Sequence, residues 1–199
     1  MALADADIHD VVMVVGFEQD QVREAVGTAA RYAVNERFAE TNSLCSFLRA
    51  RPLIEDDLLV MNADVLVDPP LVTRLAEHGG DALLYDSGSG EDDEHMKVAV
   101  EAGRLVEMAK DLPADRTDGE NLGLLRFSLG TAERVFRSAE DIAADQGEQA
   151  WLATAVNRTV AERPIHCLDV AGSPWIEIDF PLDLDRARLL KLRSPPRIW

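Results

Sequence analysis

Short apolar runs alternate along this chain with segments in which apolar residues recur every three or four positions. A continuous apolar run predicts a buried strand, whereas the three- to four-residue recurrence predicts a helix that packs one face. The strand-like runs cover residues 11–15, 31–34, 58–61, 82–85, 123–127 and 165–170. The helical recurrence covers residues 22–29, 44–48, 71–75, 135–139 and 152–160. This alternation predicts a βαβ arrangement with right-handed crossovers.

The rhythm changes after Tyr85. Residues 86–94 form a polar and acidic stretch that predicts a loop, and residues 97–107 read as a hairpin that turns at 101–103. A further helix is expected after Asp179, with Pro181 in its first turn. The chain shows no internal repeat and no linker, so we expect a single domain over residues 1–199, with a tail at 193–199.

Composition narrows the possible ligands. The net charge of −17 argues against nucleic acid, whose binding depends on clustered Lys and Arg, but Mg²⁺ would still allow a small phosphorylated ligand. No apolar run is long enough for a membrane span and no signal-peptide pattern opens the chain, so we expect a cytoplasmic protein. Cys45 and Cys167 are expected to be ordinary core residues.

Two carboxylates stand where a parallel α/β sheet presents ligands. Asp64 follows the strand-like run 58–61, and the carboxyl end of such a strand is the usual ligand edge. Asp179 closes the stretch Trp175–Asp179 far down the chain. Both could hold Mg²⁺, which prefers oxygen ligands. The alternatives are a simple turn residue for Asp64 and a helix cap before Pro181 for Asp179.

Seven segments in order carry a resemblance to a known family. They are 12–16, Asn35 with 41–42, 62–64, 96–98, Lys110, 119–120 and 175–179. In this order, from about Ile8 to Ala187, the chain resembles the sugar-phosphate nucleotidyltransferase superfamily, in particular the small cytidylyltransferases for phosphocholine or 2-aminoethylphosphonate. The resemblance implies a three-layer, Rossmann-like (GT-A-like) α/β fold with a mixed, mostly parallel sheet and helices on both faces.

The resemblance also implies a reaction. Members transfer a nucleoside monophosphate, here CMP from CTP, to a phosphate or phosphonate oxygen of a small acceptor, and they release pyrophosphate. Asp64 and Asp179 would hold the Mg²⁺. The residues that would line the nucleotide side are Asn35, Thr41, Asn42, Ser43 and Asn62. Those that would meet the acceptor are Glu120, Trp175 and Glu177.

Lys97 and Lys110 would be the catalytic cations, because a lysine is a compact point charge suited to phosphate. Each of these roles has a plainer alternative. Thr and Asn before an amphipathic run are ordinary helix caps, exposed lysines form surface ion pairs, and a tryptophan at the start of a strand commonly packs in a core. The four histidines stand at no ligand spacing, so we predict no catalytic role for them.

The chain departs from the family at its N-terminus. Members begin with a strand, a glycine-rich loop that carries an arginine, and a Pro-Lys segment, a unit of roughly 30 residues. Here residues 1–7 lead directly to the counterpart of the second strand, so the usual first strand is missing. Its absence would uncover a sheet edge and remove the triphosphate cradle. We therefore expect a homo-oligomer, a partner chain or a rearranged N-terminal segment to cover the sheet.

Three readings of this departure stay open. The chain could start too far downstream, its N-terminal part could be supplied by a separate chain, or it could be a degenerate homologue. The alternative to an enzyme is accordingly a catalytically weak or inactive nucleotidyltransferase-like binding or partner subunit without the triphosphate loop.

Overall fold

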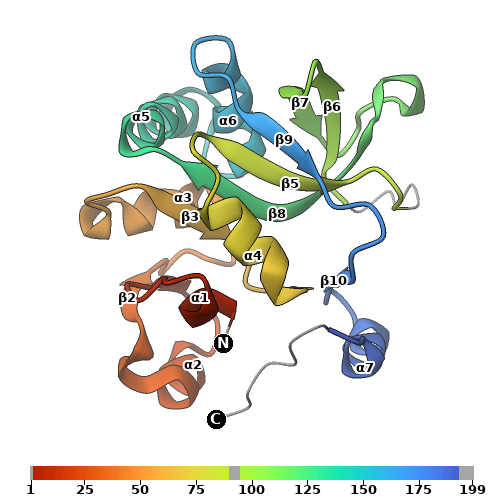
Figure 1. The fold of residues 1–199 in the computed structure, drawn as a ribbon. Helices are drawn as coiled ribbons and strands as arrows, with labels where there is room; N and C mark the ends of the chain where they lie inside the picture. Colours follow the sequence, from red (N-terminus) through yellow and green to blue (C-terminus); the bar gives the residue numbers. More distant parts are fainter. Residues whose placement is uncertain (1, 90–94, 193–199) are drawn as a thin grey trace.

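A computed structural model describes residues 2–89 and 95–192 (Figure 1). The predicted tail at 193–199 and the end of the predicted acidic loop lie outside this part. The α-helices are α1 (Ala2–Asp5), α2 (Gln19–Val26), α3 (Ser43–Ala50), α4 (Pro69–Ala76), α5 (Leu129–Gln146), α6 (Leu152–Val160) and α7 (Pro181–Leu189). The strands are β1 (Val12–Val15), β2 (Arg31–Val34), β3 (Leu58–Met61), β4 (Val65–Val67), β5 (Ala82–Asp86), β6 (Lys97–Glu101), β7 (Arg104–Ala109), β8 (Gly119–Phe127), β9 (His166–Asp169) and β10 (Trp175–Glu177).

The main sheet has six strands in the order β3-β8-β5-β9-β7-β6, and β6 also pairs with β8. From the pairings, β3, β5, β9 and β6 run in one direction, and β8 and β7 run in the other. The predicted mixed sheet is therefore confirmed. The expectation of a mostly parallel sheet holds for strand direction but not for neighbouring pairs, because only β5–β9 is a parallel pair. An apolar run does not show in which direction its strand runs. β8 lies between β3 and β5 and runs opposite to both, so both of these pairs are antiparallel.

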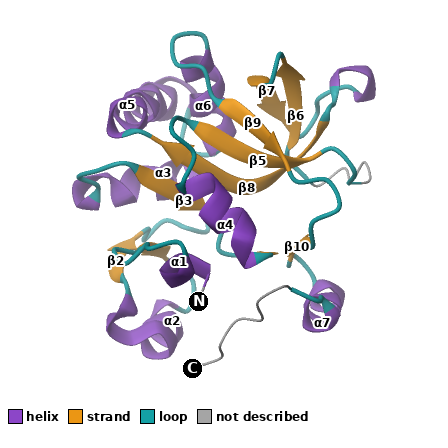
Figure 2. Cartoon of the chain, in the orientation of Figure 1, coloured by secondary structure: helices purple, strands orange, loops and turns teal. Residues whose placement is uncertain are grey.

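Helices cover both faces of this sheet, as predicted (Figures 1 and 2). On one face α3, α5 and α6 enclose a core in which the rings of Phe47 and Phe136 stack with centroids 4.2 Å apart. On the other face α4 presents Leu71, Val72 and Leu75 to a second core. Both cores follow from the amphipathic spacing of the helices, which places apolar side chains on one stripe.

Two small sheets flank the main one. β1 and β2 form a parallel pair, and β4 and β10 form an antiparallel pair. Within the described residues, β3 and β1 each end their sheets, and their apolar residues are at most half-buried except Val15. Neither β4 nor its pairing with β10 was predicted from the sequence, because three residues are too few to show a period.

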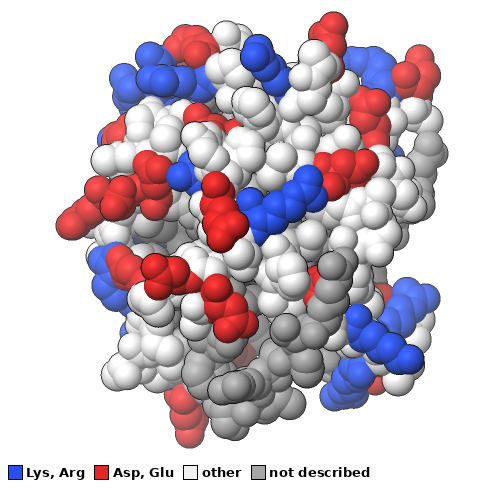
Figure 3. All heavy atoms as spheres, in the orientation of Figure 1, with Lys and Arg blue, Asp and Glu red and all other residues white. Residues whose placement is uncertain are grey.

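Charge is spread over the face that Figure 1 presents. Figure 3 shows acidic side chains dispersed over this face, while basic side chains gather at its lower right, where α7 carries Arg186 and Arg188. None of the described helices is long and apolar enough to cross a bilayer.

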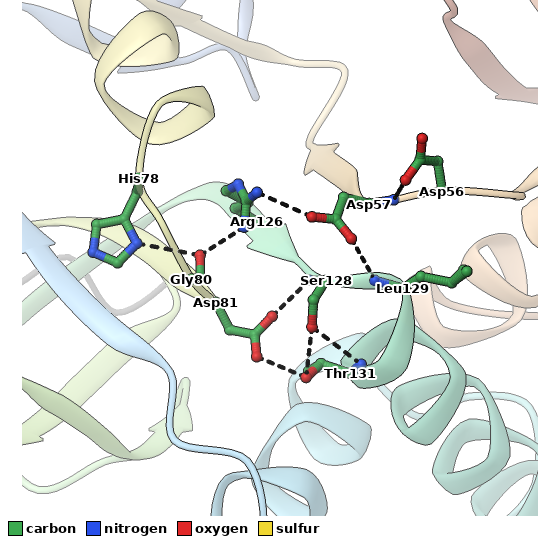
Figure 4. Close-up of polar contacts among 9 residues, drawn as sticks. All are labelled: Asp56, Asp57, His78, Gly80, Asp81, Arg126, Ser128, Leu129 and Thr131. Carbon is green, nitrogen blue, oxygen red and sulfur yellow. Dashed lines mark hydrogen bonds and ion pairs between the residues drawn. The ribbon is translucent and has the colours of Figure 1, made fainter.

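A polar network fastens the start of α5 to the strands beside it (Figure 4). The Asp81 carboxylate accepts hydrogen bonds from the Ser128 backbone N–H and the Thr131 hydroxyl, both at 2.6 Å. Arg126 donates to the Gly80 carbonyl at 2.8 Å and to Asp57 at 3.1 Å. Since the first N–H groups of a helix have no partner within the helix, these contacts satisfy groups that burial would otherwise leave unpaired.

Replacing Asp81 with Ala removes two charge-assisted hydrogen bonds and leaves the buried Thr131 hydroxyl without this acceptor. We expect the free energy of unfolding to fall by about 2–3 kcal/mol, measured by urea denaturation. Asp141→Ala, at an exposed position of α5, is the control and should change it by less than about 0.5 kcal/mol. Equal losses in the two variants would show that the network does not fasten the helix.

Candidate active site

The β4–β10 ribbon brings two distant segments together. Glu177 lies opposite Val65 in the register, and the Ile178 N–H donates to the Asp64 carbonyl at 2.9 Å. Asp64 stands in the turn between β3 and β4, and Asp179 stands two residues after β10. The two carboxylates predicted to share a metal therefore flank one short ribbon.

Glu177 lies among like charges. Burial raises the pKa of its carboxyl group, and the negative charges of Asp64 and Asp179 raise it further. A hydrogen bond from the Asn62 amide, 3.3 Å from Oε1, acts in the opposite direction. A raised pKa means that the folded chain disfavours the third negative charge, so this point of the surface favours a cation or a proton.

His95 lies between the ribbon and the main sheet. Its Nδ1 is 3.0 Å from Glu120 Oε2, and its Nε2 is 3.9 Å from Glu177 Oε2. Glu120 belongs to β8 and its side chain is only 4% exposed. The prediction that no histidine has a catalytic role stays a prediction, but the geometry places His95 beside two of the predicted site residues. Sequence spacing could not find His95, because its neighbours Glu120 and Glu177 come from β8 and β10; its one signal is its place directly before the 96–98 motif.

Trp175 lies beside this group. Its indole N–H donates to Asp86 at 2.8 Å, and its ring centroid lies 5.8 Å from that of His95. The three residues predicted to meet the acceptor, Glu120, Trp175 and Glu177, are therefore near neighbours through His95. Asn62, predicted for the nucleotide side, also reaches this group through Glu177.

The other residues predicted for the nucleotide side lie around the start of α3. Asn35, only 2% exposed, donates to the Thr41 hydroxyl at 2.9 Å. Asn42 is the N-cap of α3, and the Ser43 hydroxyl accepts from the Leu152 N–H at 2.9 Å. The contact of Asn42 is that of the helix-cap alternative. A nucleotide contact by these four residues stays a prediction.

The two lysines lie on neighbouring strands. Lys97 opens β6, opposite Glu120 in the register with β8. Lys110 follows β7, and its ammonium nitrogen lies 4.7 Å from the ring centroid of Trp151, just before α6. Since Lys97 and Ala109 are also paired, both ammonium groups belong to the same end of the β6–β7 hairpin. Their predicted contact with phosphate stays a prediction.

Within the described residues, one group of three side chains could hold a metal ion. It consists of His95, Glu177 and Asp179, whose ligand atoms all lie within 4.8 Å of one another. Asp64 is not a member of this group, although its charge acts on Glu177. The predicted pair Asp64 and Asp179 therefore remains a prediction, and the geometry adds two further donors beside it.

Comparisons with known proteins bear on this arrangement. No protein-family model matches the chain. The inositol-1-phosphate CTP transferase from T. maritima superimposes with a TM-score of 0.77 at 21% identity, over 94% of this chain and 78% of that one. The chain has the sugar-phosphate nucleotidyltransferase fold.

Two curated proteins match this chain in sequence. The bifunctional IPC transferase and DIPP synthase of Rubrobacter xylanophilus is 31% identical over 88% of this chain. The CMP-5'-(3-aminopropyl)phosphonate synthase of Streptomyces rubellomurinus is 34% identical over 98% of it. The matches span 40% and 33% of the lengths of those proteins. The resemblance predicted from the seven segments is confirmed.

Gly123 lets β8 approach Asn62 beside this site. Its φ is +72°, and a Cβ at this position would lie 2.7 Å from the Asn62 amide carbon. Gly103 has nearly the same φ, +74°, but a Cβ there would have no described heavy atom within 4 Å. Gly123 and Gly103 thus share a left-handed backbone conformation, but only a Cβ at position 123 would collide with Asn62.

Alanine variants of Gly103 and Gly123 separate the effect of the contact with Asn62 from the effect of the positive φ. Gly103→Ala should lower the free energy of unfolding by about 1–2 kcal/mol through the positive φ alone. Gly123→Ala should lose a further 1–3 kcal/mol or so, because Asn62 must move and its hydrogen bond to Glu177 breaks. Thermal and urea denaturation of both variants measure the difference; equal losses would mean that Asn62 is not held by β8.

Proposed function

We propose that this chain is a Mg²⁺-dependent nucleotidyltransferase that transfers CMP from CTP to a small phosphate or phosphonate and releases pyrophosphate. The observation that carries the proposal is the convergence of Asp64, Glu177 and Asp179 at the β4–β10 ribbon within a nucleotidyltransferase fold. The names of both curated relatives describe a transferase or a synthase, which favours an enzyme over the inactive binding subunit. The chain spans less than half of each relative, so the activity is our proposal.

The chemistry asked of the protein is modest. An oxygen of the acceptor's phosphate or phosphonate attacks the α-phosphorus of CTP, a P–O bond forms, and the bond to the β-phosphate breaks with release of pyrophosphate. The attacking oxygen is already ionised, so no strong base is required. The protein must hold two anions in line and offset the negative charge that grows on the leaving pyrophosphate.

The donor set fits Mg²⁺. Asp64 and Asp179 would hold the ion, which would neutralise charge on the phosphates of CTP. The raised pKa of Glu177 supports this assignment, because a cation between these carboxylates relieves the crowding of negative charge. Lys97 and Lys110 would hold phosphate oxygens at the end of the β6–β7 hairpin, and Glu120, Trp175 and Glu177 would face the rest of the acceptor. Asn35, Thr41, Asn42 and Ser43 would face the base and ribose.

The direct test is pyrophosphate release from CTP. We expect turnover with phosphocholine, an aminoalkylphosphonate or inositol 1-phosphate as acceptor, and none when EDTA removes Mg²⁺. Asp64→Ala should lower the rate at least a hundredfold with a change of less than about 0.5 kcal/mol in stability, because Asp64 is exposed. Asp141→Ala is the control for removal of one carboxylate. Absence of turnover with every nucleotide and acceptor would contradict the proposal for this chain.

We also propose that a second copy or a partner chain covers the edge strands β1 and β3. Their half-buried apolar residues and the exposed Phe17 and Met61, 73% and 39% exposed, support this. Exposed strand edges are templates for pairing.

Size-exclusion chromatography with light scattering tests this coverage. We expect a dimer or a larger assembly for the isolated chain, since no other partner is present in such a sample. A monomer at all concentrations would overturn self-association as the covering.

A further inference from the structure

We propose that His95, Glu177 and Asp179 form a binding site for a divalent transition ion, with Glu120 as the carboxylate that orients the histidine. This site goes beyond the proposed nucleotidyl transfer, because its ligands include a nitrogen and its formation needs no nucleotide. Two observations on the described residues carry it: the close grouping of ligand atoms and the contact between His95 and Glu120.

The spacing of the ligand atoms suits a metal ion. Two donors that are each about 2.1 Å from an ion lie about 3.0 Å apart at right angles and about 4.2 Å apart in line. His95 Nε2 and Glu177 Oε2 are 3.9 Å apart, and all three ligand atoms lie within 4.8 Å of one another. Small rotations of exposed or half-buried side chains bring this set onto one ion.

The contact behind His95 is the independent sign of a metal site. A histidine that binds a metal through one ring nitrogen commonly donates its other N–H to a carboxylate, which fixes the tautomer and the ring. His95 Nδ1 lies 3.0 Å from Glu120 Oε2, while Nε2 is directed at Glu177. The Glu120 side chain is only 4% exposed and belongs to the main sheet, so it is a rigid support for the ring. Metal sites commonly show the order carboxylate, imidazole, metal. Here Glu120 is the carboxylate, and Nε2 of His95 faces Glu177, another proposed ligand.

The donor chemistry selects the class of ion. Imidazole suits Fe²⁺, Ni²⁺ and Zn²⁺, and the affinity of such sites for Co²⁺ lies between those for Fe²⁺ and Ni²⁺, whereas Mg²⁺ is suited to oxygen ligands. Two carboxylates complete a set with room for water or phosphate oxygens. Asp179 would be a ligand both in this site and in the proposed Mg²⁺ site, so His95 is the ligand that distinguishes the two sites.

Calorimetric titration of the whole chain with Co²⁺, in the absence of nucleotide, tests the site. We expect one ion per chain and at least a tenfold weaker affinity in His95→Ala. Glu120→Gln should lose about tenfold, because the amide orients the ring less well than a carboxylate. His9→Ala removes an exposed histidine beside Asp7 and should leave the affinity unchanged. Asp64→Ala should weaken Co²⁺ binding less than His95→Ala does, because Asp64 is not one of the three ligands.

A second measurement uses the wild-type chain, so its result does not depend on whether the variants fold. With one equivalent of Zn²⁺, the nitrogen resonances of the His95 ring in the ¹⁵N-labelled wild-type chain should show Nε2 bound to metal and Nδ1 protonated. Equal Co²⁺ affinities in His95→Ala and His9→Ala, or unshifted His95 nitrogens with bound Zn²⁺, would overturn the proposal. Neither readout depends on turnover, so a failure of the proposed activity leaves this test intact.

Discussion

The short pairing of β4 with β10 is the interaction on which the candidate site depends. Three residues on each side and the hydrogen bond from Ile178 to Asp64 hold together segments more than a hundred residues apart in the chain. Without this pairing, Asp64 would be an exposed turn residue and Asp179 the residue before a helix. With it, burial raises the pKa of Glu177 and the charges of Asp64 and Asp179 raise it further, so this part of the ribbon favours a cation.

The sheet supports the ribbon from the side. β8 carries Glu120, which contacts His95, and its Gly123 accepts the backbone N–H of Asn62, whose side chain reaches Glu177. A rigid central strand thus contacts the site at two points. The cores lie on both faces of the sheet, whereas the polar side chains of the candidate site lie at the strand ends.

Much of the fold could be predicted from the sequence because its strands and helices are periodic. The run at 58–61 became β3 with the same bounds, and Asn42 is the cap of α3, as the plainer alternative for the residues before that helix allowed. Strand direction could not be predicted, because an apolar run has the same pattern either way, and β4 was too short to show a period. In the site, motif order brought Asp64, Glu120 and Glu177 into consideration. His95 was missed because its partners are brought to it only by tertiary pairing.

The central claim is that the carboxylates at the ribbon serve transfer of a nucleotide to a phosphorus oxyacid. Phosphorus-31 NMR of the chain with CTP, Mg²⁺ and 3-aminopropylphosphonate follows the bond that this claim requires. The account predicts a new pair of mutually coupled signals from the phosphonate and the α-phosphorus, rising in step with pyrophosphate. Unchanged CTP and phosphonate signals, or hydrolysis of CTP to CMP without the coupled pair, would contradict it.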